Sequence, residues 1–577
     1  MPDVAGTLTV LESKQMRTTS PLVQTMCACL LAACGARDMA KPGDSAAVIT
    51  TPSATAAAAR TEPLENLGRY HRAIQSGNAR AQTFFDEGLT LLYGFNHEEA
   101  FRSFERAAVH DTTSPMPHWG MALALGTNIN DPAPNERVAR AANHLADAMR
   151  RVSAGSAVEQ GLVAALGKRY STDTTVAQSV REQAYSDGMG ALARAHPDDA
   201  DVLTLYAESM MNLHPWKLYS AAGVPEPWTP PIVVTLERVL AAQPMHPGAN
   251  HYYVHAVEAS RRPERASRSA ERLETLVPGA GHLVHMPSHI YVRTGQYARA
   301  AKSNANAADV DARYLARTGT QNFYAMSYYS HNLQFETAAA MFSGNRVEAL
   351  SAARRTAELT EPMAADMAML EPFAAMVTLV QVRFGEWGAI LAAPAPPAAR
   401  TLQTGLYHWA RGLAFANTKR PAEAALHLDS LTRVLSRVPK DAMVGPINWG
   451  GDVLAVAVAD LQGHIASSRQ DVSGAIAAFA RAVAAEDRLG YNEPPDWLFP
   501  ERERLGVALL AAKRAAQAEA VFRAELVVHP GNPRALHGVW QSLESRHKSG
   551  ASVARQQFDD AWRSADVVLG SDLYPRR

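Results

Sequence analysis

The sequence predicts an all-α protein built as a solenoid of stacked antiparallel helix pairs, preceded by a segment outside the fold. Three observations predict it. The chain has 577 residues, too many for one compact core, so several domains or a repeat array are expected. Aromatic residues make up only 7% while alanine is abundant, which favours close-packed helices over sheets. Small and aromatic residues recur at fixed spacings along most of the chain, as in helical repeats.

The clearest repeat lies at residues 84–112. Gly88, Ala100, Phe104 and Ala107 follow one another there at gaps of 12, 4 and 3 residues. This is the tetratricopeptide pattern, with a small residue in a first helix (helix A) and small, aromatic and small residues in a second (helix B). Small residues let the two helices approach, and the ring fills the gap. Partial matches are Gly506–Ala518–Phe522, Ala475–Phe479–Ala482, Tyr291–Gly295–Ala300–Ala307, Gly344–Ala349 and Gly412–Ala424. The alternative is a generic helical bundle.

The repeats are expected to form two arrays. Residues 63–392 are the larger N-terminal array, and residues 401–577 are a smaller C-terminal array. The joint is 393–399 (APAPPAA), because a run with so many prolines cannot be helical throughout. The irregular segment 491–497 (YNEPPDW) is interpreted as a packed loop between repeats.

Residues 1–34 are interpreted as an export signal. Arg17 precedes a short apolar stretch at 21–31, about the length of a signal-peptide core and too short to span a bilayer. The segment 31–34 (LAAC) resembles the bacterial lipobox, in which the cysteine, here Cys34, is lipidated and becomes the new N-terminus. Met16 is the expected true start, and the Ala-, Ser-, Thr- and Pro-rich residues 35–62 are an expected flexible tether. The alternative is a buried N-terminal helix with an incidental cysteine.

We therefore predict a lipid-anchored protein of the cell envelope that faces the periplasm and contacts the membrane only through its lipid. The composition also excludes several classes of function. The formal net charge is −1, so there is no basic excess for binding nucleic acid. All three cysteines lie in the first 34 residues, which excludes disulfides, thiolate nucleophiles and cysteine-ligated metals from the folded body. There is no glycine-rich phosphate loop, G-x-S-x-G or H-E-x-x-H motif.

Histidines gather in two short segments of the predicted N-terminal array. The first, HYYVHAVE, contains His251, His255 and Glu258. Their spacings of i, i+4 and i+7 place the three side chains on one helix face. The second segment, HLVHMPSH, places three more histidines on one face by i, i+3 and i+7: His282, His285 and His289.

The two histidine segments are also in phase. His251 and His285 are 34 residues apart, and so are His255 and His289, which is one tetratricopeptide period. These four imidazoles are therefore expected to form a two-by-two grid on neighbouring A helices, facing the concave groove of the solenoid. His331 lies at the expected start of the next A helix, within reach of the grid.

Such a grid predicts a transition-metal site. Packed helices lie about 8–10 Å apart, so the rings can converge on one ion or on two close ions. Imidazoles with a carboxylate suit zinc, copper or iron and suit calcium or magnesium poorly. Glu258 has three open roles: metal ligand, partner that orients a histidine, or acid/base catalyst. The candidate ligands are His251, His255, His282, His285, His289, His331 and Glu258. The alternative is that these side chains bind peptide or pack the repeats.

Several motifs resemble those of a group of large bacterial tetratricopeptide-repeat proteins. They are FNHEEAFRSFERA, GANHYYVHAVE, PGAGHLVHMPSHIYVRTGQY and YNEPPDW, within residues 80–545. The resemblance implies the fold but no activity, substrate or site residue.

Three functions stay open. The first is an exported lipoprotein that binds a ligand in a histidine-rich, metal-binding groove; that ligand is a peptide, a protein or a small molecule. The second is a protein-interaction scaffold without metal. The third is a metalloenzyme that uses the same groove with Glu258 as acid/base.

Overall fold

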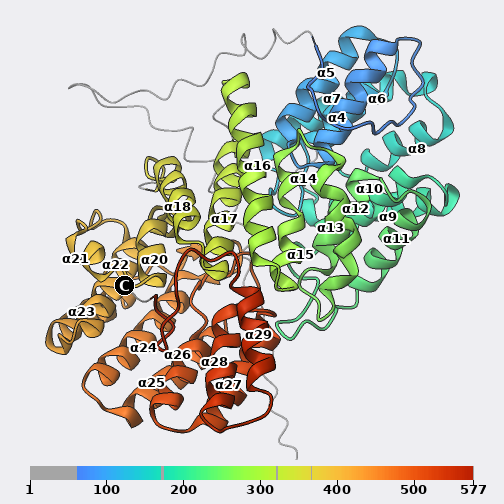
Figure 1. Cartoon of the computed structure of the whole chain (residues 1–577). Helices are drawn as coiled ribbons and strands as arrows, with labels where there is room; N and C mark the ends of the chain where they lie inside the picture. The colour runs from blue at the N-terminus through green and yellow to red at the C-terminus, as the bar shows by residue number, and fades with distance from the viewer. Residues whose placement is uncertain (1–61, 171–174, 320–322, 365–366, 576–577) are drawn as a thin grey trace, which may run out of the picture. The chain divides into compact units, whose positions relative to one another are not determined.

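The computed structural model describes residues 62–170, 175–319, 323–364 and 367–575. Met16, Cys34 and the tether up to residue 61 lie outside the described residues. The described part is almost entirely helical, with one small antiparallel hairpin of β1 (Met443–Val444) and β2 (Asn448–Trp449) (Figure 1). The prediction of an all-α, tetratricopeptide-type solenoid is confirmed.

The helices follow one another along the chain with short connections. The first group comprises α4 (Ala79–Tyr93), α5 (His97–His110), α6 (Met116–Ala124), α7 (Asn135–Arg151), α8 (Ala157–Leu166), α9 (Gln178–Ala195), α10 (Ala200–Asn212), α11 (Thr229–Ala242) and α12 (Pro247–Val257). The second comprises α13 (Ser267–Leu276), α14 (Gly281–His285), α15 (Pro287–Arg293), α16 (Tyr297–Thr318), α17 (Ser330–Ser343), α18 (Arg346–Thr360), α19 (Glu371–Ala374), α20 (Met376–Arg383) and α21 (Trp387–Ala392). The last comprises α22 (Thr401–Asn417), α23 (Pro421–Leu435), α24 (Gly450–Ser468), α25 (Val472–Glu486), α26 (Glu501–Ala511), α27 (Ala515–Val528), α28 (Pro533–Glu544) and α29 (Ala551–Ala561). Short turns of other helix types are η1 (Val152–Ala154), η2 (Pro263–Ala266), η3 (Ala325–Tyr329) and η4 (Ala368–Leu370).

Neighbouring helices pack through the predicted small and aromatic positions. Phe104 of α5 is fully buried between Gly88 of α4 and Gly120 of α6. A β-carbon at Gly88 would lie 2.7 Å from the Phe104 ring, so the helices pack at this distance only because glycine has none. Phe522 lies in the same way between Gly506 and Gly538.

The turn from helix A to helix B repeats a left-handed backbone residue. Gly295, Gly344 and Gly385 occupy it at φ of 80°, 79° and 68°, which suits glycine. At the first repeat the residue is Phe95, with φ 57°, a conformation that a bulky side chain rarely adopts.

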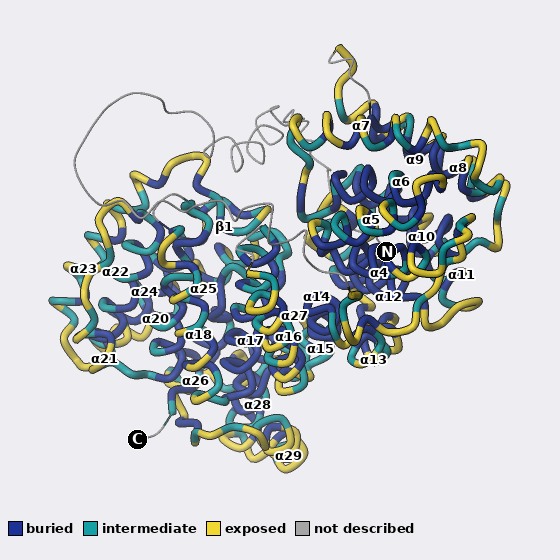
Figure 2. The backbone as a smooth tube through the Cα atoms, turned by 90° about the horizontal axis from the view of Figure 1, so that it is seen from above, coloured by how far each residue is buried: buried dark blue, intermediate teal, exposed yellow. Residues whose placement is uncertain are grey.

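Buried residues are concentrated on some of the helices, among them α12 and α14. The backbone in Figure 2 is dark blue along α12 and α14 and yellow along much of α29. One cluster of buried apolar side chains runs from Leu67 to Phe499, and a second surrounds Phe522. Segment 393–399 contains no helix and separates α21 from α22. The division into two arrays stays a prediction. Among the described residues, no helix is both long and apolar enough to cross a membrane.

Replacing Phe104 with alanine is expected to lower the free energy of unfolding by about 3–5 kcal/mol, because the cavity between two glycines cannot collapse. Chemical denaturation of the full-length protein measures the change. Phe101 of α5 is only half-buried, so Phe101→Ala is the matched control and should cost much less. Equal losses for both variants would contradict this account of the packing.

Candidate metal centre

Four helices position the histidines. His251 and His255 lie on α12, and Glu258 follows that helix directly. His282 and His285 lie on α14, His289 on α15 and His331 on α17. Proline stands at the first position of both α12 and α15, where its missing N–H costs no hydrogen bond. All six histidines come together, in two groups of three.

The first triad consists of His251, His255 and His282. One nitrogen from each ring lies within 4.8 Å of the other two. The Nε2 atoms of His251 and His282 are 3.1 Å apart. The Nδ1 atom of His251 lies 2.5 Å from the backbone carbonyl of Tyr93. The Nε2 atom of His255 is buried without a hydrogen-bond partner.

The second triad consists of His285, His289 and His331, and its nitrogens satisfy the same 4.8 Å limit. The Nε2 atoms of His285 and His289 are 2.8 Å apart. The ring of His331 lies 4.8 Å from that of His285, centroid to centroid. The two triads are in contact, since the rings of His255 and His289 are 5.4 Å apart.

This arrangement differs from the predicted grid. The 34-residue phase pairs His251 with His285, whereas in the structure His251 meets His282. Two local features account for the difference. Pro287 cannot donate the helical hydrogen bond to residue 283, and the helix is divided into α14 and α15. Asn304 of α16 also holds the His285 ring, with Oδ1 2.6 Å from Nδ1.

The predicted open groove is also corrected. His251, His285 and His289 are at most 1% exposed and His331 is half-buried, so the rings lie largely inside the fold. Aromatic side chains cover it. Phe95 lies 4.5 Å from His251, Tyr328 lies 4.6 Å from His282, and Phe335 lies 5.2 Å from His289, all between ring centroids. The strained backbone of Phe95 therefore directs its ring onto the first triad.

Glu258 joins the two triads. Its Oε1 lies 2.8 Å from Nδ1 of His255, and its Oε2 lies 2.5 Å from Nδ1 of His289. Burial favours the neutral acid, but the His289 and His255 rings outweigh it and hold the pKa of Glu258 well below its ordinary value. Of the three roles considered for Glu258, the geometry fits the partner that orients histidines.

The contact with Asn304 fixes which nitrogen of His285 carries hydrogen. The Asn304 amide donates to the Ala300 carbonyl, so its Oδ1 can only accept from Nδ1 of His285. Nδ1 of His289 lies 2.5 Å from the Glu258 carboxylate as an ion-pair contact. The Nε2 atom of His285 is then a bare lone pair, and it lies 2.8 Å from Nε2 of His289. Two nitrogens at this distance share either a proton or a metal ion.

Burial also keeps most of these rings neutral. It lowers the pKa of His251, His282 and His285 well below the ordinary imidazole value, and neighbouring rings lower it further. Burial, with His289 nearby, lowers the pKa of His331 to about 3. Burial also opposes charge on His289, but Glu258 outweighs it and raises the pKa. Neutral imidazole is the form that binds metal.

Sequence reasoning missed several neighbours of the site. Asn304 and the Tyr93 carbonyl carry no sequence signal for such a role. Glu493 lies in the YNEPPDW segment, interpreted above only as a packed loop. Burial raises the pKa of Glu493 to about 6, and its charge interacts with His289. Its side chain accepts a hydrogen bond from the Tyr491 hydroxyl at 2.7 Å. A glutamate beside two prolines and between aromatic residues was the available signal.

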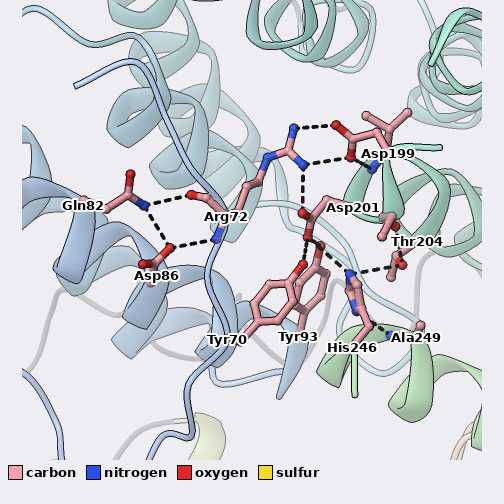
Figure 3. Close-up of polar contacts among 12 residues, drawn as sticks. Tyr70, Arg72, Gln82, Asp86, Tyr93, Asp199, Asp201, Thr204, His246 and Ala249 are labelled. Carbon is pink, nitrogen blue, oxygen red and sulfur yellow. Dashed lines mark hydrogen bonds and ion pairs between the residues drawn. The ribbon is translucent and has the colours of Figure 1, made fainter. Parts of the chain in front are cut away.

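A second buried network supports the site from the N-terminal side of α12 (Figure 3). Asp201 accepts hydrogen bonds from the Tyr70 and Tyr93 hydroxyls, each at 2.6 Å, and from Arg72 at 2.8 Å. His246 lies 3.3 Å from the same carboxylate, and its Nδ1 accepts from the backbone N–H of Ala249 at the start of α12. The Tyr93 carbonyl contacts the His251 ring, and α12 carries His251. The network therefore holds both the hydrogen-bond partner of that ring and the start of the helix on which it lies.

No family model and no curated protein matches the chain. Among solved structures, the human IFIT1 dimer with m7Gppp-AAAA is similar over 85% of this chain and 90% of its own, at 11% identity and a TM-score of 0.28. Yeast Tom70 is similar over 84% of this chain and 92% of its own, at 10% identity and a TM-score of 0.29. The Cut9–Hcn1 hetero-tetramer is similar over 84% of this chain and 74% of its own, at 12% identity and a TM-score of 0.26. No ligand or activity follows from similarity at this level.

Proposed function

We propose that this chain binds a transition metal, namely zinc, copper or iron, through the six histidines of the two triads. The observation that carries the proposal is the convergence of these histidines into two groups of three, with one nitrogen from each ring within 4.8 Å of the others in its group. In the second group the Nε2 atoms of His285 and His289 lie 2.8 Å apart, so one metal ion beside them can bind both. All-nitrogen ligands with a carboxylate-oriented histidine are typical of such metals.

The test is direct metal analysis. Full-length protein is incubated separately with Zn²⁺, Cu²⁺ and Fe²⁺, desalted and analysed for bound element. We expect stoichiometric binding of at least one metal, and release on acidification, because protons compete for imidazole nitrogen. Absence of stoichiometric binding for all three metals would rule out the proposal.

We further propose that the protein is an exported lipoprotein, anchored to the cell envelope and facing the periplasm. The lipobox at Cys34 supports this, as does a folded body without cysteine. Changing Cys34 to serine is expected to abolish lipid labelling and release the protein from membranes. Metabolic labelling with a fatty acid and membrane fractionation measure both effects. Membrane retention and labelling equal to those of the unchanged protein would contradict the lipid anchor.

A protein-interaction scaffold is the second candidate. One surface feature favours it, a cavity of about 450 Å³ whose walls come from α9, α10 and the start of α11. Its lining mixes apolar, aromatic and charged side chains, including Tyr206, His214, Trp228, Asp187 and Arg194. Such a cavity suits a peptide segment, and it lies apart from the triads, so binding there is compatible with a metal centre. The third candidate, a metalloenzyme with Glu258 as acid/base, is disfavoured because both carboxylate oxygens already hold histidines.

A further inference from the structure

We infer that the site is a two-ion centre, with one ion in each triad and an open coordination position on each ion for a small anionic ligand. This inference rests on the proposed metal binding and deepens it. Its basis is the division of six histidines into two sets of three, with one carboxylate between them.

The division into two sets is set by the scaffold. His251 is anchored by the Tyr93 carbonyl, and His285 is anchored by Asn304. These separate anchors direct the Nε2 atom of His251 to His282 and that of His285 to His289. Each triad thus offers three nitrogens within 4.8 Å of one another, the number that one ion accepts from a protein at an open site.

Glu258 is positioned to act on both ions at once. One of its oxygens accepts a hydrogen bond from Nδ1 of His255, and the other lies 2.5 Å from Nδ1 of His289 in the other triad. A carboxylate in this place fixes the tautomer and raises the basicity of the ligand nitrogen on the far side of the ring. Because one carboxylate does this for both triads, weakening it should weaken both sites together. Glu258 is a positioning residue in this account.

The coordination of each ion is incomplete. Structural zinc sites have four protein ligands, whereas catalytic sites have three and leave a position for water or substrate. Among the described residues, each of these two groups of possible ligands has three members. The nearby carboxylate of Glu258 contacts Nδ1 atoms of the ligand rings, so it is not a fourth ligand. An exogenous ligand is therefore expected on each ion.

Charge indicates the chemical class of that ligand. Neutral imidazoles contribute no charge, so two divalent ions in this site are opposed only in part by the carboxylates of Glu258 and Glu493. Uncompensated charge in a buried site is costly, which favours small anions such as hydroxide on the open positions. Rings of the two triads approach to 5.4 Å between His255 and His289 and to 5.5 Å between His282 and His285. The two ions are therefore neighbours, and one anion can contact both.

The first experiment counts zinc ions per chain in full-length protein. We expect two ions in the unchanged protein and one in each triad variant, His251→Gln/His282→Gln and His285→Gln/His331→Gln. The matched control is His408→Gln/His427→Gln. These two rings also face each other, with Nδ1 atoms 3.0 Å apart, but no third histidine joins them. This control should keep two ions.

The outcomes separate the two claims. One ion in the unchanged protein would overturn the two-ion centre while metal binding stands, and no ion would overturn both. If a triad variant fails to fold, the count in the unchanged protein still decides.

The second experiment tests Glu258 and the open positions. Glu258→Gln is expected to weaken zinc binding in both triads by roughly 10–100-fold, while helicity is retained. Weakening of only one triad would overturn the shared role of Glu258. In cobalt(II)-loaded protein, added azide should change the visible absorption spectrum as it enters the open positions. A spectrum unchanged by saturating azide would show closed coordination and overturn that part of the inference.

Discussion

Saturating zinc is expected to raise the free energy of unfolding by about 4 kcal/mol for each bound ion when free zinc is 1,000-fold above its dissociation constant. The gain follows because the triads exist only in the folded chain, where residues 251–331 bring the histidines together. Chemical denaturation with zinc, and again after chelation, measures the increment.

The control for this increment is again the pair of His408 and His427, which lies outside the triads. His408→Gln/His427→Gln should keep the stabilisation by zinc, because it leaves both triads intact. His285→Gln/His289→Gln should lose at least about half of it, since it removes two ligands of one ion and one of the two Glu258 contacts. Equal stabilisation of both variants by zinc would locate metal binding elsewhere in the chain.

Replacing Glu503 with glutamine is expected to lower the free energy of unfolding by about 3–5 kcal/mol, because it leaves a buried guanidinium without its charge partner. Glu503 of α26 holds Arg383 of α20 by two contacts of 2.7 and 3.1 Å, and both side chains are at most 1% exposed. Asn532 donates to the same carboxylate at 2.9 Å. Chemical denaturation without added metal measures the loss.

An exposed pair serves as the control for Glu503. Arg262 and Glu264 are 75% and 52% exposed, so Glu264→Gln should change stability by less than about 1 kcal/mol. The buried pair also has a pH signature. Burial raises the pKa of Glu503, but Arg383 outweighs it and lowers the pKa to about 2. Its stabilisation is therefore complete above the ordinary glutamate pKa of about 4.3 and is lost as pH falls towards 2. A similar loss in both variants would contradict the buried pair's role.

The fold could be predicted because its determinants are local. The spacing of Gly88, Ala100, Phe104 and Ala107 defines which faces of two helices meet, and those residues pack as predicted. The contact of Arg383 with Glu503, 120 residues away, left no such signal.

The candidate site could be predicted only in part. Helical spacing predicted five of the histidines and Glu258, because residues on one helix face point in one direction, and the order of the repeats added His331. The repeat period did not give the pairing, which depends on the division of the helix at Pro287 and on Asn304 from another helix. The repeat period also could not predict that Phe95 covers the first triad, because the direction of its ring depends on a left-handed backbone at a turn.

The most direct test of metal binding by the two triads is a crystal structure of the zinc-loaded full-length protein, measured at the zinc absorption edge. The account predicts two anomalous peaks, one beside the Nε2 atoms of His251, His255 and His282, the other beside His285, His289 and His331. A map from zinc-saturated crystals without an anomalous peak at either triad would contradict it.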